Sequence, residues 1–248
     1  MGLLSAGKWQ KASISSSVAA YEGHIGGVGV VLAVSGVGRA RAEATARLVL
    51  ENLQPRSMLS LGFAGGLVPG QRAGGLVVVQ TLVPMRILAN GSSEPLDMEP
   101  IASHPELYER AAETVTRLDL RHDSGACVTA SRILSRPEEK RRLAKATGAL
   151  AVEMESYWTA MVCREFQVPF LTIRSIVDEL DSPLPDYIAR VALDTGPQGR
   201  WKHVLPTLLR PHHAPGLVKL AFAATAARRS LTKFVKGFVG TPAQAITA

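Results

Sequence analysis

Cysteine, aromatic side chains and long hydrophobic runs are all scarce in this chain of 248 residues. Its two cysteines, Cys127 and Cys163, are too few for a disulfide framework or a cysteine metal cluster, which favours a reduced, cytoplasmic setting. No uninterrupted apolar run reaches ~18 residues, so the sequence predicts no transmembrane helix. Residues 1–20 lack the pattern of a secretory signal, and Ala6 stands where a myristoylation motif requires Ser or Thr.

The charge is basic and uneven. The formal net charge is +7, and basic residues gather in Arg136–Lys145 and in the tail from Arg210 onward. Such a balance permits nucleic-acid binding. However, aromatic residues make up only 5% of the chain and do not alternate with the basic ones, so we expect no nucleic-acid partner. A content of 46% apolar and 20% charged residues predicts a globular chain with a full core.

Short apolar, β-branched runs alternate with helical patterns along the chain. Strands are expected near residues 28–34, 58–61, 76–83, 125–129 and 169–177, and helices near 40–51, 105–118 and 137–147. This alternation predicts the α/β class: a single three-layer αβα domain around a mixed, largely parallel, twisted central sheet. The stretch Asp181–Gly199 is punctuated by Pro and Gly and is expected to be a loop with a short helix.

The end of the chain has a different composition. We expect one domain over residues 1–200 and a basic, helical extension over 201–248. Within Gly216–Val239, apolar residues recur at roughly helical spacing, with Lys and Arg among them. Two interpretations stay open: a helix that packs on the domain with its basic face in solvent, or a helix that lies on a membrane surface.

Acidic residues stand at the ends of two neighbouring elements in the stretch Gly148–Asp181. Glu153 and Glu155 directly precede a helical pattern, and Asp178 ends an apolar strand. Ligands of open α/β sheets bind at the carboxyl ends of the strands. An acid there can protonate a leaving group if burial raises its pKa. Either carboxylate alone fits a solvated acid beside a core element, whereas the two together favour a functional site.

Two glycine-rich segments follow predicted strands. They are Ser35–Gly38 (SGVG) and Phe63–Leu67 (FAGGL). Backbone amides at a strand–helix turn can face an anion or a sugar, and adjacent glycines let the backbone approach a flat ligand closely. The full dinucleotide-binding pattern is absent, so each segment alone also fits an ordinary tight turn.

In combination, the segments SGVGRARA, LGFAGGL, AVEMES and RSIVDE resemble the purine nucleoside phosphorylase/uridine phosphorylase superfamily in order and spacing. The chain is most similar to its methylthioadenosine/S-adenosylhomocysteine nucleosidase branch, over about Tyr21–Asp181. The resemblance implies a nucleoside phosphorylase-like fold and cleavage of the N-ribosidic bond of a 5′-substituted adenosine with release of adenine, as in methionine salvage. It further implies no cofactor, no metal, a small-molecule nucleoside as substrate, and a homodimer or other homo-oligomer.

The resemblance also implies residue roles. Asp178 matches the acid that protonates N7 of the purine, Glu155 matches the carboxylate that binds the ribose hydroxyls, and Met154 packs against the sugar. The other substrate-binding residues that it implies are Ser35, Phe63, Ala64, Gly65, Ile133 and Glu153. Among these, Ile133 replaces the family's stacking aromatic residue, and Glu153 is expected to be structural rather than catalytic. We expect the carboxyl groups of Glu155 and Asp178 to open into one cavity.

Two departures from the family pattern affect the chemistry. Phosphorylases carry an Arg ahead of the glycine segment and a Ser within it; here Ser60 and Phe63 stand at those places, which favours water over phosphate as the nucleophile. The family's first strand, with its water-activating acid, has no counterpart, since residues 1–20 contain no Asp or Glu and Glu22 matches a non-catalytic position. A catalytically impaired nucleoside-binding protein and a purely structural protein therefore remain as alternatives.

The segment after Asp181 departs from the nucleosidase pattern. Its LPTLLRPHHAP stretch and basic terminal helix are similar to the hopanoid-associated branch, which is linked to removal of adenine from adenosylhopane. The alternative function is therefore an adenosylhopane nucleosidase or phosphorylase at the inner face of the membrane. A lipid-tailed substrate would give the basic, apolar terminal helix a role.

Overall fold

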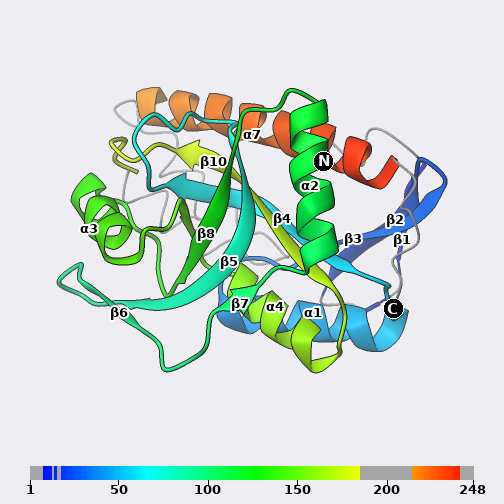
Figure 1. Cartoon of the computed structure of the whole chain (residues 1–248). Coiled ribbons are helices and arrows are strands. Elements are labelled where there is room, and N and C mark those ends of the chain that lie inside the picture. Colours follow the sequence, from blue (N-terminus) through cyan, green and yellow to red (C-terminus); the bar gives the residue numbers. More distant parts are fainter. Residues whose placement is uncertain (1–7, 13, 16–17, 185–213, 241–248) are drawn as a thin grey trace.

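The computed structural model describes residues 8–12, 14–15, 18–184 and 214–240 (Figure 1). In chain order, the elements are β1 (Gln10–Lys11), β2 (Ala19–Ile25), β3 (Val28–Val34), α1 (Arg39–Leu53), β4 (Met58–Gly66), β5 (Leu76–Ile87), β6 (Ser93–Pro95), β7 (Ile101–Ala102), α2 (Pro105–Arg117), β8 (His122–Ala130), α3 (Pro137–Thr147), β9 (Ala151–Glu153), α4 (Ser156–Glu165), β10 (Phe170–Asp178) and α7 (Ala214–Gly240).

A seven-stranded mixed sheet forms the centre of the molecule. Its parallel pairings join β10 to β4, β5 to β8 and β8 to β9. Antiparallel pairings join β4 to β9 and β10 to β5, so these five strands close into a ring. The short strands β6 and β7 pair with β5 at the margin. The mixed sheet expected from the sequence is confirmed.

Helices cover both faces of this sheet. In Figure 1, α1 and α4 lie on one side and α2 and α7 on the other. Leu50 of α1 and Val162 of α4 belong to one buried apolar cluster. Val115 of α2 and Phe234 of α7 belong to another, which they share with Ile173 of β10. Two separate cores on opposite sheet faces confirm the three-layer αβα arrangement.

The strand expected near residues 58–61 is longer than the sequence indicated: β4 continues to Gly66, so Phe63–Gly66 does not form the tight turn that the segment alone also fits. Gly65 pairs with Val152 of β9 on one side and with Asp178 of β10 on the other. Pairing with strands that come much later in the sequence holds these residues extended. The three-residue strand β9, which the sequence did not predict, arises from the same pairing.

The strand expected over residues 28–34 is present. The βαβ interpretation placed it in the central sheet, however, and it does not join that sheet. It forms an antiparallel hairpin with β2 in a separate three-stranded sheet. Gly26 and Gly27 make the two-residue turn, with φ of 58° and 82°. Positive φ at both positions suits the tight hairpin turn and favours glycine. The hairpin places the segment that follows, Ser35–Gly38, beside the N-terminus of α4.

The terminal helix α7 packs on the domain, as the first interpretation of its sequence predicts. Phe234 and Phe238 are buried against the central sheet, while Lys233 and Lys236 are exposed. Within the described ranges, no helix combines the length and apolar character needed to cross a membrane. The short helix expected near Asp181–Gly199 falls, from residue 185 onward, outside the described residues.

Candidate functional site

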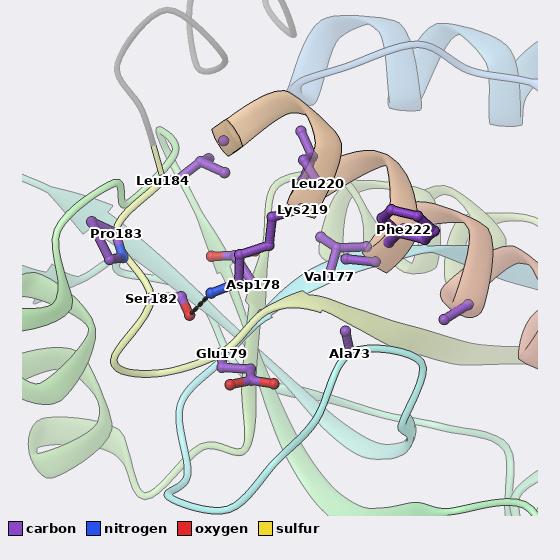
Figure 2. Close-up of a pocket in the computed structure, with 13 residues that line it drawn as sticks. Ala73, Val177, Asp178, Glu179, Ser182, Pro183, Leu184, Lys219, Leu220 and Phe222 are labelled. Atoms are coloured by element: carbon purple, nitrogen blue, oxygen red, sulfur yellow. Dashed lines mark hydrogen bonds between the residues drawn. The ribbon is translucent and has the colours of Figure 1, made fainter. Parts of the chain in front are cut away.

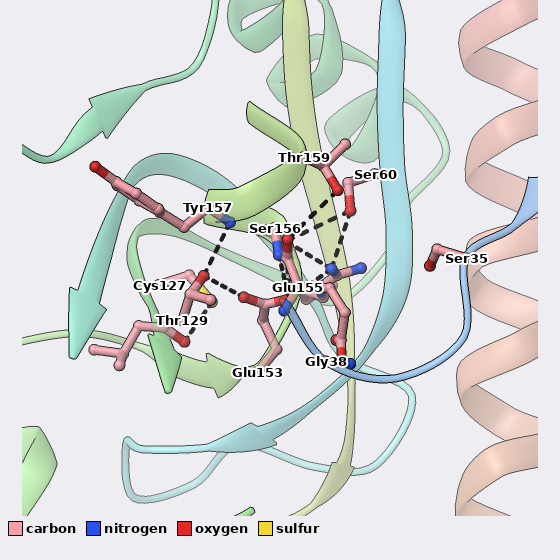
Figure 3. A network of polar contacts seen from close by, with 12 residues as sticks. Ser35, Gly38, Ser60, Cys127, Thr129, Glu153, Glu155, Ser156, Tyr157 and Thr159 are labelled. Carbon is pink, nitrogen blue, oxygen red and sulfur yellow. Dashed lines mark hydrogen bonds and ion pairs between the residues drawn. The ribbon is translucent and has the colours of Figure 1, made fainter. Parts of the chain in front are cut away.

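Glu155 stands directly before the first residue of α4, as expected for a carboxylate at a helix entrance. Its Oε1 accepts a hydrogen bond of 2.7 Å from the backbone N–H of Gly38 (Figure 3). An amide of the SGVG segment thus faces a carboxylate of the chain itself. Burial raises the pKa of Glu155, and the charge of Glu153 raises it further, while Arg174 opposes the rise.

Glu153, the last residue of β9, is buried and binds groups of the protein. Its Oε2 accepts the backbone N–H groups of Glu155 and Ser156 at 2.9 and 2.8 Å, and a guanidinium N–H of Arg174 at 2.7 Å. The hydroxyl of Thr129 donates to Oε1. Burial acts to raise the pKa of Glu153, but the Arg174 charge and these hydrogen bonds outweigh burial and lower it. These contacts fit the structural role expected of Glu153.

Arg174 is a residue whose role sequence reasoning missed. It lies in β10, is 3% exposed, and its Nη2 also donates to Ser60 Oγ at 3.0 Å and Ser156 Oγ at 2.6 Å. A Cβ at Gly62 would lie 2.4 Å from Arg174 Nη1, so glycine makes room for the guanidinium. The sequence contained a signal for this role, because Arg174 is the one charged residue within the apolar stretch 169–177. A charge in a buried strand requires partners.

Asp178 is the last residue of β10, at the carboxyl end of the strand, as expected. Its side chain is 12% exposed, and Oδ2 forms an ion pair with the fully buried ammonium of Lys140 from α3. A Cβ at Gly65 would lie 3.1 Å from Oδ2, so the glycine of β4 lies against this carboxyl. Burial raises the pKa of Asp178, and Lys140 opposes that rise.

Two charged residues of the basic stretch Arg136–Lys145 lie inside the protein. Lys140 and Glu139 are 0% and 3% exposed, so this helix directs charged groups inward. The sequence offered one signal: Lys140 precedes the apolar Leu143 by three residues, and residues three apart share a helix face. Lys140 therefore lies on the buried face of α3.

A cavity of about 370 Å³ lies between the end of β10, the loop that follows it and the first half of α7 (Figure 2). Asp178 lines this cavity together with apolar side chains that include Val177 and Leu220. On its wall, Lys219 Nζ donates to Ser182 Oγ at 3.1 Å. Glu155 is not among the lining residues. A cavity shared by both carboxyls therefore stays a prediction.

The other expected site residues occupy varied positions. Ser35 Oγ donates to the adjacent Gly36 carbonyl at 3.1 Å, and Figure 3 shows its side chain apart from the Glu153 network. Phe63 is 46% exposed, whereas Ala64 is buried. Ile133 and Met154 are half-buried.

Both cysteines are buried free thiols. Burial raises the pKa of Cys163 to about 12 and also raises that of Cys127. Among the residues that the structure describes, no three or more His, Cys, Asp and Glu side chains form a group that could hold a metal ion.

Two buried carboxyls with raised pKa values lie at a strand end and at a helix entrance of a three-layer α/β domain, and a carboxyl of raised pKa is the kind of group that can act as an acid in bond cleavage. The chain belongs to the phosphorylase superfamily, whose sequence profile matches residues 5–193. This finding confirms the resemblance seen in the sequence motifs.

Curated relatives include two 5′-methylthioadenosine/S-adenosylhomocysteine nucleosidases. The protein from Tolumonas auensis is 31% identical over 166 residues, which cover 64% of this chain and 72% of the relative. The protein from Geobacillus kaustophilus is 29% identical over 164 residues, which cover 63% of this chain and 70% of the relative. Relatives at this level are therefore nucleosidases within the phosphorylase superfamily.

Solved structures show the same fold. The 5′-methylthioadenosine/S-adenosylhomocysteine nucleosidase from Neisseria meningitidis, in complex with methylthio-immucillin-A, has a TM-score of 0.68 at 22% identity and covers 92% of this chain and 90% of its own. The futalosine hydrolase of Helicobacter pylori has a TM-score of 0.72 at 21% identity and covers 96% and 91%. The expected nucleoside phosphorylase-like fold is confirmed.

Proposed function

We propose that this chain cleaves the N-ribosidic bond of a 5′-substituted adenosine and releases adenine, with Asp178 as general acid and Glu155 as ribose anchor. The observation that carries the proposal is the buried carboxyl of Asp178, with a raised pKa, at the carboxyl end of a sheet strand. The names of the relatives, methylthioadenosine/S-adenosylhomocysteine nucleosidases, support this substrate class.

In the proposed reaction, the Asp178 carboxyl gives its proton to N7 of the purine. The bond between C1′ and N9 then breaks with its electron pair moving to the base, which leaves as neutral adenine. Positive charge develops on the sugar, and the Glu155 carboxylate stabilises it while accepting hydrogen bonds from the ribose hydroxyls. Water adds at C1′ and loses a proton. Met154, Ile133, Ser35 and the Phe63–Gly65 segment are proposed to contact the nucleoside.

Water rather than phosphate is the proposed nucleophile. The position where phosphorylases carry an arginine holds Ser60, and the cation beside it, Arg174, is engaged with Glu153 and Ser156 inside the protein. Phe63, at the position of the phosphorylase serine, supplies no cation. These contacts leave no arginine at this position to hold phosphate.

The test measures adenine release from methylthioadenosine, adenosylhomocysteine and adenosine, with and without phosphate. We expect phosphate-independent release and its loss in Asp178→Asn with the fold retained. A strict phosphate requirement would exclude the hydrolase, and a near-normal rate in Asp178→Asn would exclude the acid role. Tight adenosine binding in calorimetry without adenine release would instead favour the nucleoside-binding protein.

We also propose peripheral contact of α7 with an anionic membrane surface. Val218 and Phe222 are 53% and 74% exposed. Further along the helix, Arg228, Arg229 and Lys236 line one groove. No Asp or Glu occurs within residues 214–240. Exposed apolar side chains beside cations suit a lipid interface, and a lipid-tailed adenosine such as adenosylhopane is then the alternative substrate.

Vesicle binding tests this surface with matched charge changes. We expect the protein to bind vesicles that contain anionic lipid, and Arg228→Glu/Arg229→Glu to abolish binding. The control, Arg56→Glu/Arg164→Glu, makes the same charge change at exposed positions, of which Arg164 lies in α4, across the sheet from α7. Equal binding by both double variants would overturn the proposal. Deleting the helix would be uninformative, because Phe234 is part of the core.

A homo-oligomer is proposed as well. Val28, Val31 and Val34 of the hairpin are 47%, 37% and 56% exposed; Val28 and Val34 lie on one face of β3 and Val31 on the other, so the strand exposes apolar side chains on both faces. Large exposed apolar surface is typical of interaction sites. Light scattering of the purified chain should therefore report a mass above that of a monomer, and a monomeric mass at assay concentration would contradict the proposal.

A further inference from the structure

Lys140 is a buried cation to which the proposed reaction assigns no role. Its side chain is 0% exposed, and its Nζ forms an ion pair with Asp178 Oδ2. The same Nζ donates to the backbone oxygen of Glu179 at 2.9 Å and to that of Asp178 at 3.4 Å. A lysine ammonium has three N–H donors and no acceptor. The three oxygens therefore account for all of its hydrogens.

Burial of the Lys140 ammonium costs free energy. A buried ammonium loses its hydration, and only well-placed partners offset that loss. Contacts with the two backbone oxygens link α3 to the end of β10. The third contact, however, is to the carboxyl of Asp178, the group proposed to donate the proton. The geometry therefore links Lys140 to the reacting carboxyl as well as to the backbone.

We propose that Lys140 is a positioning residue for Asp178: its ammonium orients the carboxyl and stabilises the carboxylate that remains once the proton has passed to the leaving base. This inference rests on the proposed function of Asp178. The proton moves from Asp178 to N7, the bond between C1′ and N9 breaks, and Asp178 is left ionised against Lys140. Water then gives its hydroxyl to C1′ and its proton restores the Asp178 carboxyl.

Other charged groups surround this end of β10. They are Glu179, which follows the strand; Arg72, in the loop before β5, which contacts Glu179 at 3.4 Å; Asp123 of β8, which accepts from Gln71 at 3.0 Å; and Lys219 of α7, which lines the cavity. Lys140 is the cation in contact with the Asp178 carboxyl in the described part of the chain. Its removal should therefore change the field at that carboxyl most directly.

The test follows kcat/KM against pH for the wild type, Lys140→Met, Lys140→Arg and Lys145→Met. The acid must be protonated to act, so activity falls as pH rises through the pKa of Asp178. Loss of the positive charge raises that pKa, and an opposite charge at contact shifts a carboxyl by about 1–3 units. In Lys140→Met we therefore expect the alkaline limb of the kcat/KM profile, the part where activity falls as pH rises, to move to higher pH by about 1–3 units. We also expect kcat to be reduced and KM to change little.

The other variants separate charge from structure. Lys140→Arg keeps the charge and should keep the limb, and Lys145→Met, the same substitution at an exposed position of α3, should match the wild type. An unmoved limb in a folded, active Lys140→Met would overturn the proposal and leave the proposed function intact. If Lys140→Met does not fold, Lys140→Arg decides: a retained limb supports the proposal and a displaced limb overturns it.

A second readout works without turnover. The Asp178 carboxyl can be titrated by ¹³C NMR in the ligand-free protein. The Asp178→Asn variant lacks its carboxyl signal and so identifies that signal in the wild-type spectrum. If the wild type releases no adenine, the proposed function fails and the catalytic role of Lys140 fails with it. The carboxyl titration would then still show whether Lys140 controls Asp178, and an unshifted titration in Lys140→Met would remove that control too.

Discussion

Replacement of Arg174 by Met should destabilise the fold strongly, because it leaves the Glu153 carboxylate buried without its counter-ion. The side chains of Arg174 and Glu153 are 4% and 1% exposed, and 2.7 Å separates Arg174 Nη2 from Glu153 Oε2. Removal of one partner of such a buried pair costs about 3–5 kcal/mol. Since a domain is stable by only about 5–15 kcal/mol, this loss is a large fraction of the total. The backbone N–H groups that Glu153 also binds soften the effect but carry no full charge.

Urea unfolding followed by circular dichroism measures this loss. The double variant Glu153→Gln/Arg174→Met should recover part of it, because no unpaired charge then remains in the core. Arg47→Met serves as the control: its ion pair with Glu165 is exposed on both sides, so stability should change little. A loss in Arg174→Met no larger than that of one ordinary hydrogen bond, about 1 kcal/mol, would refute the reasoning.

Three further outcomes follow from the same network. Gly62→Ala places a Cβ 2.4 Å from the Arg174 guanidinium and should cost about 1–3 kcal/mol by overpacking; an unchanged melting temperature would contradict this. Gly38 has φ of 93° and ψ of 166°, a region restricted to glycine, so Gly38→Ala should strain the amide that binds Glu155 and weaken nucleoside binding; an unchanged Kd in calorimetry would count against it. The pKa of Glu153 is lowered from 4.5, so its contribution to stability is complete above that value and is lost as pH falls through the lower folded pKa. The stability advantage of the wild type over Glu153→Gln should therefore shrink on acidification, and an advantage that grows would show the sign to be wrong.

Local pattern alone was enough to place both carboxyls. The helix expected at 137–147 is α3 (Pro137–Thr147), with a proline at its start and Gly148 at its end. Glu155 lies at the entrance of α4 and Asp178 at the end of β10, as the apolar periodicity predicted. Short-range signals suffice for such positions because proline, glycine and apolar spacing act within a few residues.

Pairings between distant segments could not be predicted in the same way. The extension of β4 through Gly65 depends on strands that come about a hundred residues later, β9 and β10. The inward direction of Lys140 depends on where β10 ends relative to α3. In the sequence, only its spacing from Leu143 sets Lys140 apart from the other cations of its stretch, and that spacing does not identify its partners at the end of β10.

The proposed reaction requires opposite protonation states of the two carboxyls, and the structure gives each its own surroundings. Glu155 must be ionised to stabilise the sugar, and the Gly38 amide and Arg174 favour that form against burial and Glu153. Asp178 must begin protonated, which burial favours, while Lys140 favours the ionised form that follows proton transfer.

Because different cations serve them, the two carboxyls should titrate independently. Glu155→Gln should therefore lower kcat yet leave the alkaline limb, which Asp178 and Lys140 set, where it is in the wild type. Two carboxyls can bind opposite ends of one nucleoside without direct contact, whereas carboxyls in direct contact would interact, and removal of one would shift the apparent pKa of the other. A limb displaced by about one pH unit or more in Glu155→Gln would thus show direct coupling and contradict the independent titration.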